Sequence, residues 1–185
     1  MKSLTEKLEM VTDEELMLEA KNGDMKCVSE LFLRYNGQLY HFFYGNLKDD
    51  ALSKDLVQGV FERVIKYRTK YDQKFSFKPW LFKIAWNEQN DYFRSKRMTL
   101  PGSEELTKMI PKEDSLKDDQ SDAKERLKKA IRLLSPEQQN LLDLTHFQGF
   151  RYAEVAEIMD CSLSAVKVRM HRLMKSLRAE FYNIQ

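Results

Sequence analysis

The chain has 185 residues, of which 42% are hydrophobic and 32% are charged, and its formal net charge is +2. At about 150 residues per domain this length fits one domain or two small ones, and the hydrophobic content excludes a wholly disordered chain. Six glycines and four prolines are too few for the turns of an all-β barrel or sandwich.

Two helices are predicted at the N-terminal end. Thr12 and Glu15 form a capping box that begins the first helix, and Gly23 ends it. Asp24 is suited to cap the second helix. The apolar residues of that helix keep a spacing of three and four: Val28, Leu31, Phe32, Tyr35, Leu39 and Phe42.

Two more helices follow, with a basic loop between them. Apolar residues at helical spacing predict a third helix from about Asp50 to Tyr67. The period is lost from Arg68 to Ser76, which reads as a loop with aromatic and basic residues. A fourth helix is predicted from about Phe77 to Met98, with Pro79 tolerated in its first turn.

The remaining residues predict a linker and a second helical domain. Residues 99–121 hold prolines, serines and an acidic excess without a sustained period, which is typical of a flexible linker. Beyond it, helices are expected over 122–134, from a Ser135 capping box to Gly149, over 152–159, and from the Ser162 cap to about Phe181. The expected fold is therefore all-α, with two small helical domains, residues 1–98 and 122–185.

Charge and cysteine content narrow the class of protein further. From Arg63 to Arg97 there are 10 Lys and Arg against 3 Asp and Glu, and from Ser162 to Gln185 there are 5 against 1. Two separate basic blocks suggest two contacts with a polyanion, of which nucleic acid is the commonest long one. Cys27 and Cys161 are too few for a disulfide framework or a four-ligand metal site.

The sequence also lacks the signals of membrane, secreted and catalytic proteins. No apolar run approaches the roughly 18 residues of a membrane span, and the N-terminus is acidic rather than a basic segment followed by an apolar one. There is no H-E-x-x-H pattern, Gly-rich phosphate loop or G-x-S-x-G. We therefore expect a cytoplasmic protein that is not an enzyme and that needs no cofactor or metal.

The last two predicted helices have the lengths and the three-residue turn of a helix-turn-helix. Ala156 is the small residue that a close helix crossing needs, Val166 turns inward, and Asp160 stands where such turns usually have glycine. The outer face of the last helix is almost purely basic, which suits contacts with phosphates and base edges. An ordinary amphipathic helix with solvated lysines is the alternative.

The fourth predicted helix and the loop before it combine rings with positive charges. Such a combination suits single-stranded nucleic acid, because rings stack on bases while cations follow the backbone. Phe82, Trp86 and Phe93 are better explained as core, whereas both interpretations stay open for Phe75, Phe77 and Trp80. In the third helix, Asp55, Gln58 and Glu62 form a polar stripe that fits protein docking or simple solvation.

These segments, in this order, resemble the sigma-70 family of bacterial RNA polymerase sigma factors, in its extracytoplasmic-function type. Asp55–Phe61 is similar to the core-binding motif, although Gly59 stands where an acidic residue is usual. Phe77–Asn87, with Asp91 and Arg94, is similar to the helix that melts and reads the minus-ten element. Leu133–Gln138, Tyr152–Ile158 and Ser164–Arg169 are similar to the domain that reads the minus-thirty-five element.

The resemblance implies a role for each candidate residue. Core RNA polymerase would be bound by Asp55, Leu56, Gln58, Phe61 and Glu62. The minus-ten element would be held by Lys70, Lys74, Phe75, Phe77, Lys78, Trp80, Lys83, Asn87, Asp91 and Arg94. The minus-thirty-five element would be read by Ser162, Ser164, Ala165, Lys167, Val168, Arg169, His171, Arg172 and Lys175.

The resemblance also implies partners. The chain would direct core RNA polymerase to promoters and help open the DNA, binding it both as duplex and as single strand. An anti-sigma factor, soluble or membrane-anchored, would be a further partner, and no small-molecule substrate is expected.

Two other functions are the alternatives to a sigma factor. One is an autonomous helix-turn-helix regulator with a helical effector- or partner-binding domain. The other is a small helical enzyme, for which the sequence lacks any convergent acid, base or metal set.

Overall fold

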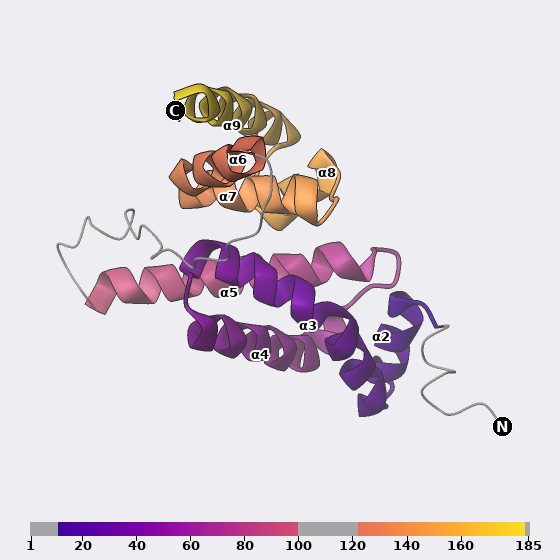
Figure 1. Ribbon diagram of the computed structural model, residues 1–185. Helices are drawn as coiled ribbons and strands as arrows, with labels where there is room; N and C mark the ends of the chain where they lie inside the picture. The colour runs from indigo at the N-terminus through magenta and orange to yellow at the C-terminus, as the bar shows by residue number, and fades with distance from the viewer. Residues whose placement is uncertain (1–10, 100–121, 184–185) are drawn as a thin grey trace. The chain divides into compact units, whose positions relative to one another are not determined.

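The computed structural model describes residues 11–99 and 122–183, and within these ranges it contains helices and turns but no strand (Figure 1). The all-α prediction is therefore confirmed for the described part of the chain. The predicted linker lies outside the described residues, except for Thr99 at the end of α5. None of the described helices is both long and apolar enough to cross a membrane.

The chain divides into two compact units. The first unit holds α2 (Asp13–Lys21), α3 (Met25–Leu47), α4 (Asp50–Tyr67), the short 3₁₀ helix η1 (Arg68–Lys70) and most of α5 (Phe77–Thr99). The second holds α6 (Asp122–Leu133), α7 (Pro136–Leu142), the π-helical turn η3 (Asp143–Phe147), most of α8 (Tyr152–Ile158) and α9 (Leu163–Asn183). The helix ranges agree with the predicted ones to within a residue or two, except around η3.

The helix starts of the first unit follow from local sequence. The side chain of Thr12 accepts from the Glu15 backbone N–H at 3.3 Å, and the Glu15 carboxylate accepts from the Thr12 N–H at 2.9 Å, which confirms the capping box. Asp24 caps α3 as predicted, by accepting from the N–H of Lys26 at 3.0 Å. Gly23, with φ at +111°, supplies the left-handed turn between α2 and α3.

An aromatic cluster forms the centre of the first unit. The rings of Phe42 and Phe43 on α3 and Phe77 and Phe82 on α5 are all fully buried. The centroid of the Phe42 ring lies 5.4 Å from that of Phe43 and 5.7 Å from that of Phe82, in edge-to-face contacts. α3 packs against both α2 and α4, so the four helices share one core.

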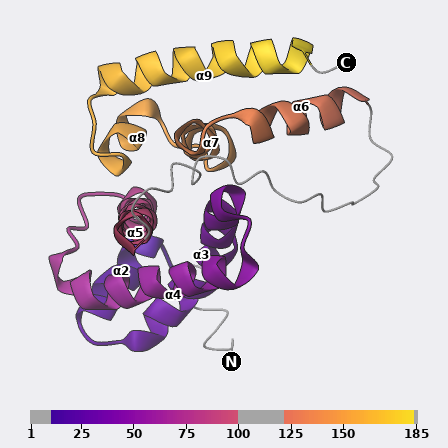
Figure 2. The same ribbon diagram turned by 90° about the vertical axis from the view of Figure 1, so that its left-hand side faces the viewer.

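The second unit packs α9 along α6 and α7 (Figure 2). Ser135 caps α7 in a capping box with Gln138, as predicted. The helix expected to run on to Gly149 instead changes to a π-helical turn at Asp143. At this turn the Thr145 hydroxyl donates to the carbonyl oxygens of Leu141 at 2.7 Å and Leu142 at 3.3 Å, and such bonds compete with the backbone ladder and often bend a helix.

The predicted helix-turn-helix is present in α8 and α9. Asp160 adopts the left-handed conformation with φ at +52°, and the Ser162 hydroxyl accepts from the N–H of Ala165 at 3.1 Å to cap α9. Ala156 and Val166 are buried at the helix crossing, as expected. Leu163 and Met174 of α9 are exposed, although their positions along the helix are close to the apolar face that holds Val166.

Gly59 marks the close contact between α4 and α5. A Cβ atom placed on Gly59 would lie 3.0 Å from the Oε1 atom of Glu88 and 3.3 Å from its Cδ atom. Such distances require Glu88 to move. The absence of a side chain at Gly59 therefore leaves space for the Glu88 side chain of α5 against α4.

We predict that Gly59→Ala stabilises the protein less than a helical glycine-to-alanine change normally does. Glycine inside a helix costs about 0.5–1 kcal/mol relative to alanine, but here the new methyl group displaces Glu88. Urea denaturation should show the full gain only in the Glu88→Ala background. A Cβ atom placed on Gly37 in α3 would have no neighbouring atom within 4 Å, so Gly37→Ala is the matched control. Equal gains at both glycines would contradict the prediction.

Candidate functional site

The predicted polar stripe of α4 is exposed, but two of its apolar neighbours are not. Asp55, Gln58 and Glu62 face the solvent, and the Gln58 amide donates to the Glu62 carboxylate at 3.1 Å. Leu56 and Phe61, which the sequence assigned to the same contact surface, are buried. That assignment is corrected: both side chains are largely covered, and the Phe61 ring lies edge-on to Phe32 at 5.0 Å.

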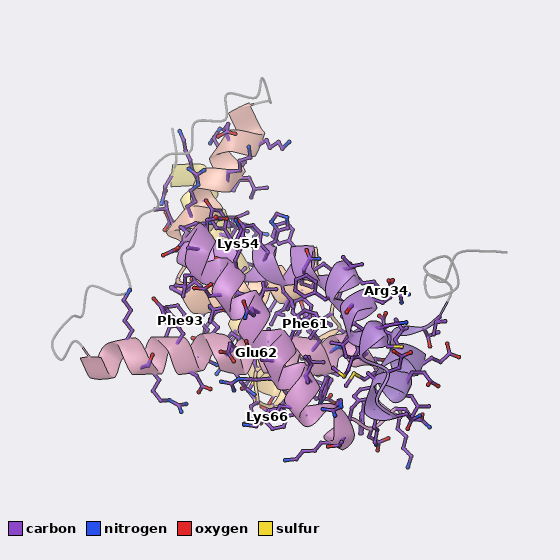
Figure 3. All side chains as sticks on the ribbon, turned by 90° about the horizontal axis from the view of Figure 1, so that it is seen from below. Arg34, Lys54, Phe61, Glu62, Lys66 and Phe93 are labelled. Atoms are coloured by element: carbon purple, nitrogen blue, oxygen red, sulfur yellow. The ribbon has the colours of Figure 1, made fainter. Side chains whose placement is uncertain are left out.

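A groove runs between α3 and α4 beside this stripe. Its volume is about 590 Å³, and its walls come from both helices: Phe32, Asn36, Gly37, Tyr40, Asp50, Lys54, Val57 and Gln58. The Tyr40 hydroxyl donates to the Asp50 carboxylate at 2.9 Å at one end. Asp50 and Lys54 are the charged residues of the groove lining, and Figure 3 shows Lys54 and Glu62 at different points along α4.

Apolar side chains continue from this groove onto a second, shallower one. Phe32 lines both, and the second is completed by Met25, Val28, Ser29, Leu33, Phe61 and Ile65. Phe32 is 40% exposed and Leu33 is 66% exposed. Sequence periodicity placed Phe32 in the core, and the structure corrects this. Phe61, although buried, still forms one wall of the second groove.

The loop before α5 presents one aromatic ring and two lysines. Phe75 is 62% exposed, and Lys70 and Lys74 are exposed beside it. Phe77 was a candidate to contact unpaired bases, but it is fully buried. That assignment is corrected, because Phe77 packs on Tyr35 at 5.5 Å and on Tyr71 at 6.1 Å.

The exposed side of α5 carries the polar residues that were candidates for the minus-ten contact. Lys83, Asn87 and Arg94 are exposed, and Lys78, Trp80 and Asp91 are partly exposed. The Trp80 ring rests on Tyr71 at 5.2 Å. Phe82 is buried as expected, whereas Trp86 and Phe93 are only half-buried. Lys83, Asn87 and Arg94 therefore form a row of exposed donors on α5, and the partly exposed indole of Trp80 lies nearer its N-terminal end.

An ion-pair cluster that sequence reasoning missed joins α4 to α5. Arg63 of α4 contacts the carboxylate of Glu88 and that of Asp91, the latter at 3.0 Å. Asp91 also lies 3.7 Å from Arg94. Burial raises the pKa of Glu88, while Arg63 opposes the shift and Asp91 and Glu62 add to it. Asp91, a candidate DNA contact, is thus already paired with two arginines.

The outer face of α9 is open to the solvent. Ser162, Ser164, Lys167, Val168, His171, Arg172 and Lys175 are exposed, and Ala165 and Arg169 are partly exposed. Arg169 forms an ion pair with Glu137 of α7 at 3.0 Å. No local pattern predicts this partner, because 32 positions separate the two residues along the chain. Within the described residues, no group of three or more His, Cys, Asp or Glu side chains is placed to hold a metal ion.

Both units match parts of one known family. Residues 31–99 match Sigma-70 region 2, and residues 124–177 match Sigma-70, region 4. The chain belongs to the sigma-70 family. The first match contains the α4 stripe, the loop and α5, and the second contains the helix-turn-helix, so the two matched regions carry all three candidate surfaces.

Relatives and solved structures agree with this assignment. RNA polymerase sigma factor CarQ of Myxococcus xanthus is 26% identical over 158 residues, which cover 85% of this chain and 91% of CarQ. ECF RNA polymerase sigma factor SigM of Bacillus subtilis is 28% identical over 157 residues, 84% of this chain and 95% of SigM. This sigma factor is of the extracytoplasmic-function type. Sigma factor RpoE of Bartonella quintana, solved with the anti-sigma factor NepR, shares its fold, with a TM-score of 0.68 at 21% identity over 85% of this chain and 98% of RpoE.

We predict that Glu137 limits the affinity of the sigma factor for duplex DNA. Glu137→Gln frees Arg169 and removes a carboxylate beside it, so binding should tighten and its salt dependence should steepen by about one phosphate contact. Fluorescence anisotropy of the full chain with labelled duplex, across a series of salt concentrations, measures both. Glu125→Gln is the control, because Glu125 is paired with Lys128 on its own helix at 2.8 Å. An unchanged slope in Glu137→Gln would remove Arg169 from the contact.

Proposed function

We propose that this chain binds core RNA polymerase, directs it to specific promoters and helps to open the DNA, with a separate surface for each task. The observation that carries the proposal is the order of the two matched regions. The first contains an exposed stripe on α4 and a row of donors on α5. The second contains a helix-turn-helix whose outer face is basic.

The α4 stripe and the adjoining groove are the proposed docking surface for core polymerase. Exposed Asp55, Gln58 and Glu62 supply charge and hydrogen bonds, and the groove supplies apolar contact at Phe32, which is 40% exposed. An apolar centre with a polar rim is the usual composition of a protein interface. We also propose an anti-sigma factor as a partner, supported by a similar fold solved with one.

The loop and α5 are the proposed surface for the opened minus-ten element. Phe75 and Trp80 offer rings on which unpaired bases can stack, and Lys74, Lys78 and Lys83 lie along the same segment. Stacking on an aromatic ring contributes about 1–3 kcal/mol per base, which is comparable to the cost of taking a base out of the duplex. Binding energy would thus drive strand opening.

The proposed duplex contact is made by α9 in the major groove. Ser164, Lys167 and Val168 are exposed in its first turns, where the recognition helix of a helix-turn-helix meets base edges. The later residues Arg172 and Lys175 would contact phosphates.

Because the proposed function requires core polymerase and chromosomal DNA, we place the chain in the cytoplasm. Nucleotide addition is catalysed by the polymerase. Family membership disfavours the autonomous regulator.

The first test compares the chain with and without core polymerase. We expect weak or no promoter binding by the free chain in a gel shift, and promoter-specific transcription once core polymerase is added. The reason is that the free chain lacks the contacts that hold both surfaces on one promoter. Strong operator binding by the free chain, unaffected by core polymerase, would contradict the proposal and favour the regulator.

The second test separates the two surfaces of the first unit. Asn87→Ala should reduce permanganate reactivity of the opened strand while leaving the affinity for core polymerase unchanged, because Asn87 is exposed on α5 away from the α4 stripe. Gln58→Ala is the reciprocal variant, expected to weaken core binding by about 1 kcal/mol with normal opening in the complexes that form. Identical defects in both variants would show that the surfaces are not separate.

A further inference from the structure

Two hydrogen bonds from α2 hold the loop that precedes α5 at both of its ends. The backbone N–H of Phe77, the first residue of α5, donates to the Glu14 carboxylate at 2.8 Å. The Lys21 ammonium donates to the carbonyl oxygen of Tyr71 at 3.3 Å. The partners are 63 and 50 positions apart in sequence. A nine-residue helix thus spans the segment from Tyr71 to Phe77.

The bond from Glu14 is favourable for two physical reasons. The first N–H groups of a helix have no acceptor within the helix, so an external oxygen is needed at Phe77. A carboxylate also interacts favourably with the partial positive charge at a helix N-terminus. Glu14 therefore serves α5 as a cap, although it belongs to another helix.

α2 is itself fixed firmly to the rest of the unit. Leu16, Met17 and Ala20 are fully buried. Asp13, at the start of α2, accepts from the Tyr35 hydroxyl and forms an ion pair with Arg34 at 2.7 Å. The two bonds to the loop therefore start from a rigid base.

The loop between the two bonds is also ordered internally. The Tyr71 hydroxyl donates to the carbonyl oxygen of Phe75 at 2.6 Å, and the Phe75 N–H donates to the carbonyl oxygen of Asp72 at 3.1 Å. The Asp72 carboxylate accepts from the Lys74 N–H at 3.0 Å. Phe75 and Lys74 are thereby presented to the solvent from a backbone that is tied at several points.

We propose that α2 is a positioning element for strand opening: Glu14 and Lys21 set the loop so that Phe75 and Lys74 meet an unpaired base without further ordering. A loop that had to be ordered on binding would lose affinity through its conformational entropy. The match to Sigma-70 region 2 begins at residue 31, so α2 lies outside it. The proposal rests on the opening function assigned above to the loop.

The test uses holoenzyme assembled from the full chain on a promoter that it transcribes. The probe is that promoter with 2-aminopurine at the non-template minus-ten positions, prepared both as duplex and with those positions mismatched. Glu14→Ala should lower the fluorescence increase on the duplex by about tenfold, as expected for loss of a helix-capping acceptor. Glu14→Gln keeps an acceptor oxygen and should restore most of the signal. Core affinity should be unchanged in both variants.

Two further variants complete the experiment. Glu19→Ala removes an exposed acid from the same helix and should behave as wild type. Lys21→Met removes the bond to the Tyr71 carbonyl and should lower the fluorescence increase on the duplex as Glu14→Ala does. It also keeps the proposal testable where Glu14→Ala fails to fold. A normal signal in Lys21→Met and Glu14→Ala, or a defect explained fully by lost core affinity, would overturn the proposal. Failure of the wild-type holoenzyme to open any promoter would instead overturn the proposed function.

Discussion

The packing of α5 against the aromatic core determines which of its side chains are available to a ligand. Phe77, Leu81, Phe82 and Ala85 are completely buried. Because a helix turns once every 3.6 residues, burying this face leaves Lys83, Asn87 and Arg94 on the opposite side. Rotation of α5 would expose phenylalanine rings and bury charged groups, both at a large cost. The core therefore sets the register of the row of donors that we assign to DNA.

Acidic residues sit within both basic surfaces and limit their charge. Glu88 and Asp91 pair with Arg63 on the first unit, and Glu137 pairs with Arg169 on the second. Contacts with phosphates bind any sequence. A carboxylate next to an arginine weakens these sequence-independent phosphate contacts and orients the guanidinium. Sequence-specific contacts then contribute a larger share of the binding free energy. On the surfaces that we propose for DNA, these pairs would favour discrimination over affinity, in a protein that has to find promoters among a large excess of other DNA.

The sequence predicted those parts of the structure that depend on neighbouring residues. The capping boxes at Thr12 and Ser135 and the left-handed Asp160 were predicted correctly, because each involves residues within a turn. Side-chain direction was harder: Phe77 points inward and Phe32 outward. Phe77 is the first residue of α5, where the periodic pattern has only begun, and Phe32 lies near the edge of the apolar arc of α3, where packing decides. The bonds of Glu14 to α5 and of Arg169 to Glu137 join distant segments, and periodicity contains no information on them.

Tyr71 contributes to the internal order of the loop that we propose as a support for an unpaired base. Burial, with smaller contributions from Glu14, Asp13 and Asp72, raises its pKa to about 12. A phenol whose pKa is raised by folding stabilises the folded state below its ordinary pKa near 10, and this contribution is lost only as the pH rises through about 12. The hydroxyl therefore stays a donor to Phe75 at any physiological pH. Because burial is the main cause of this shift, α2 acts on the position of Phe75 chiefly through its hydrogen bonds to Phe77 and Tyr71 at the two ends of the loop.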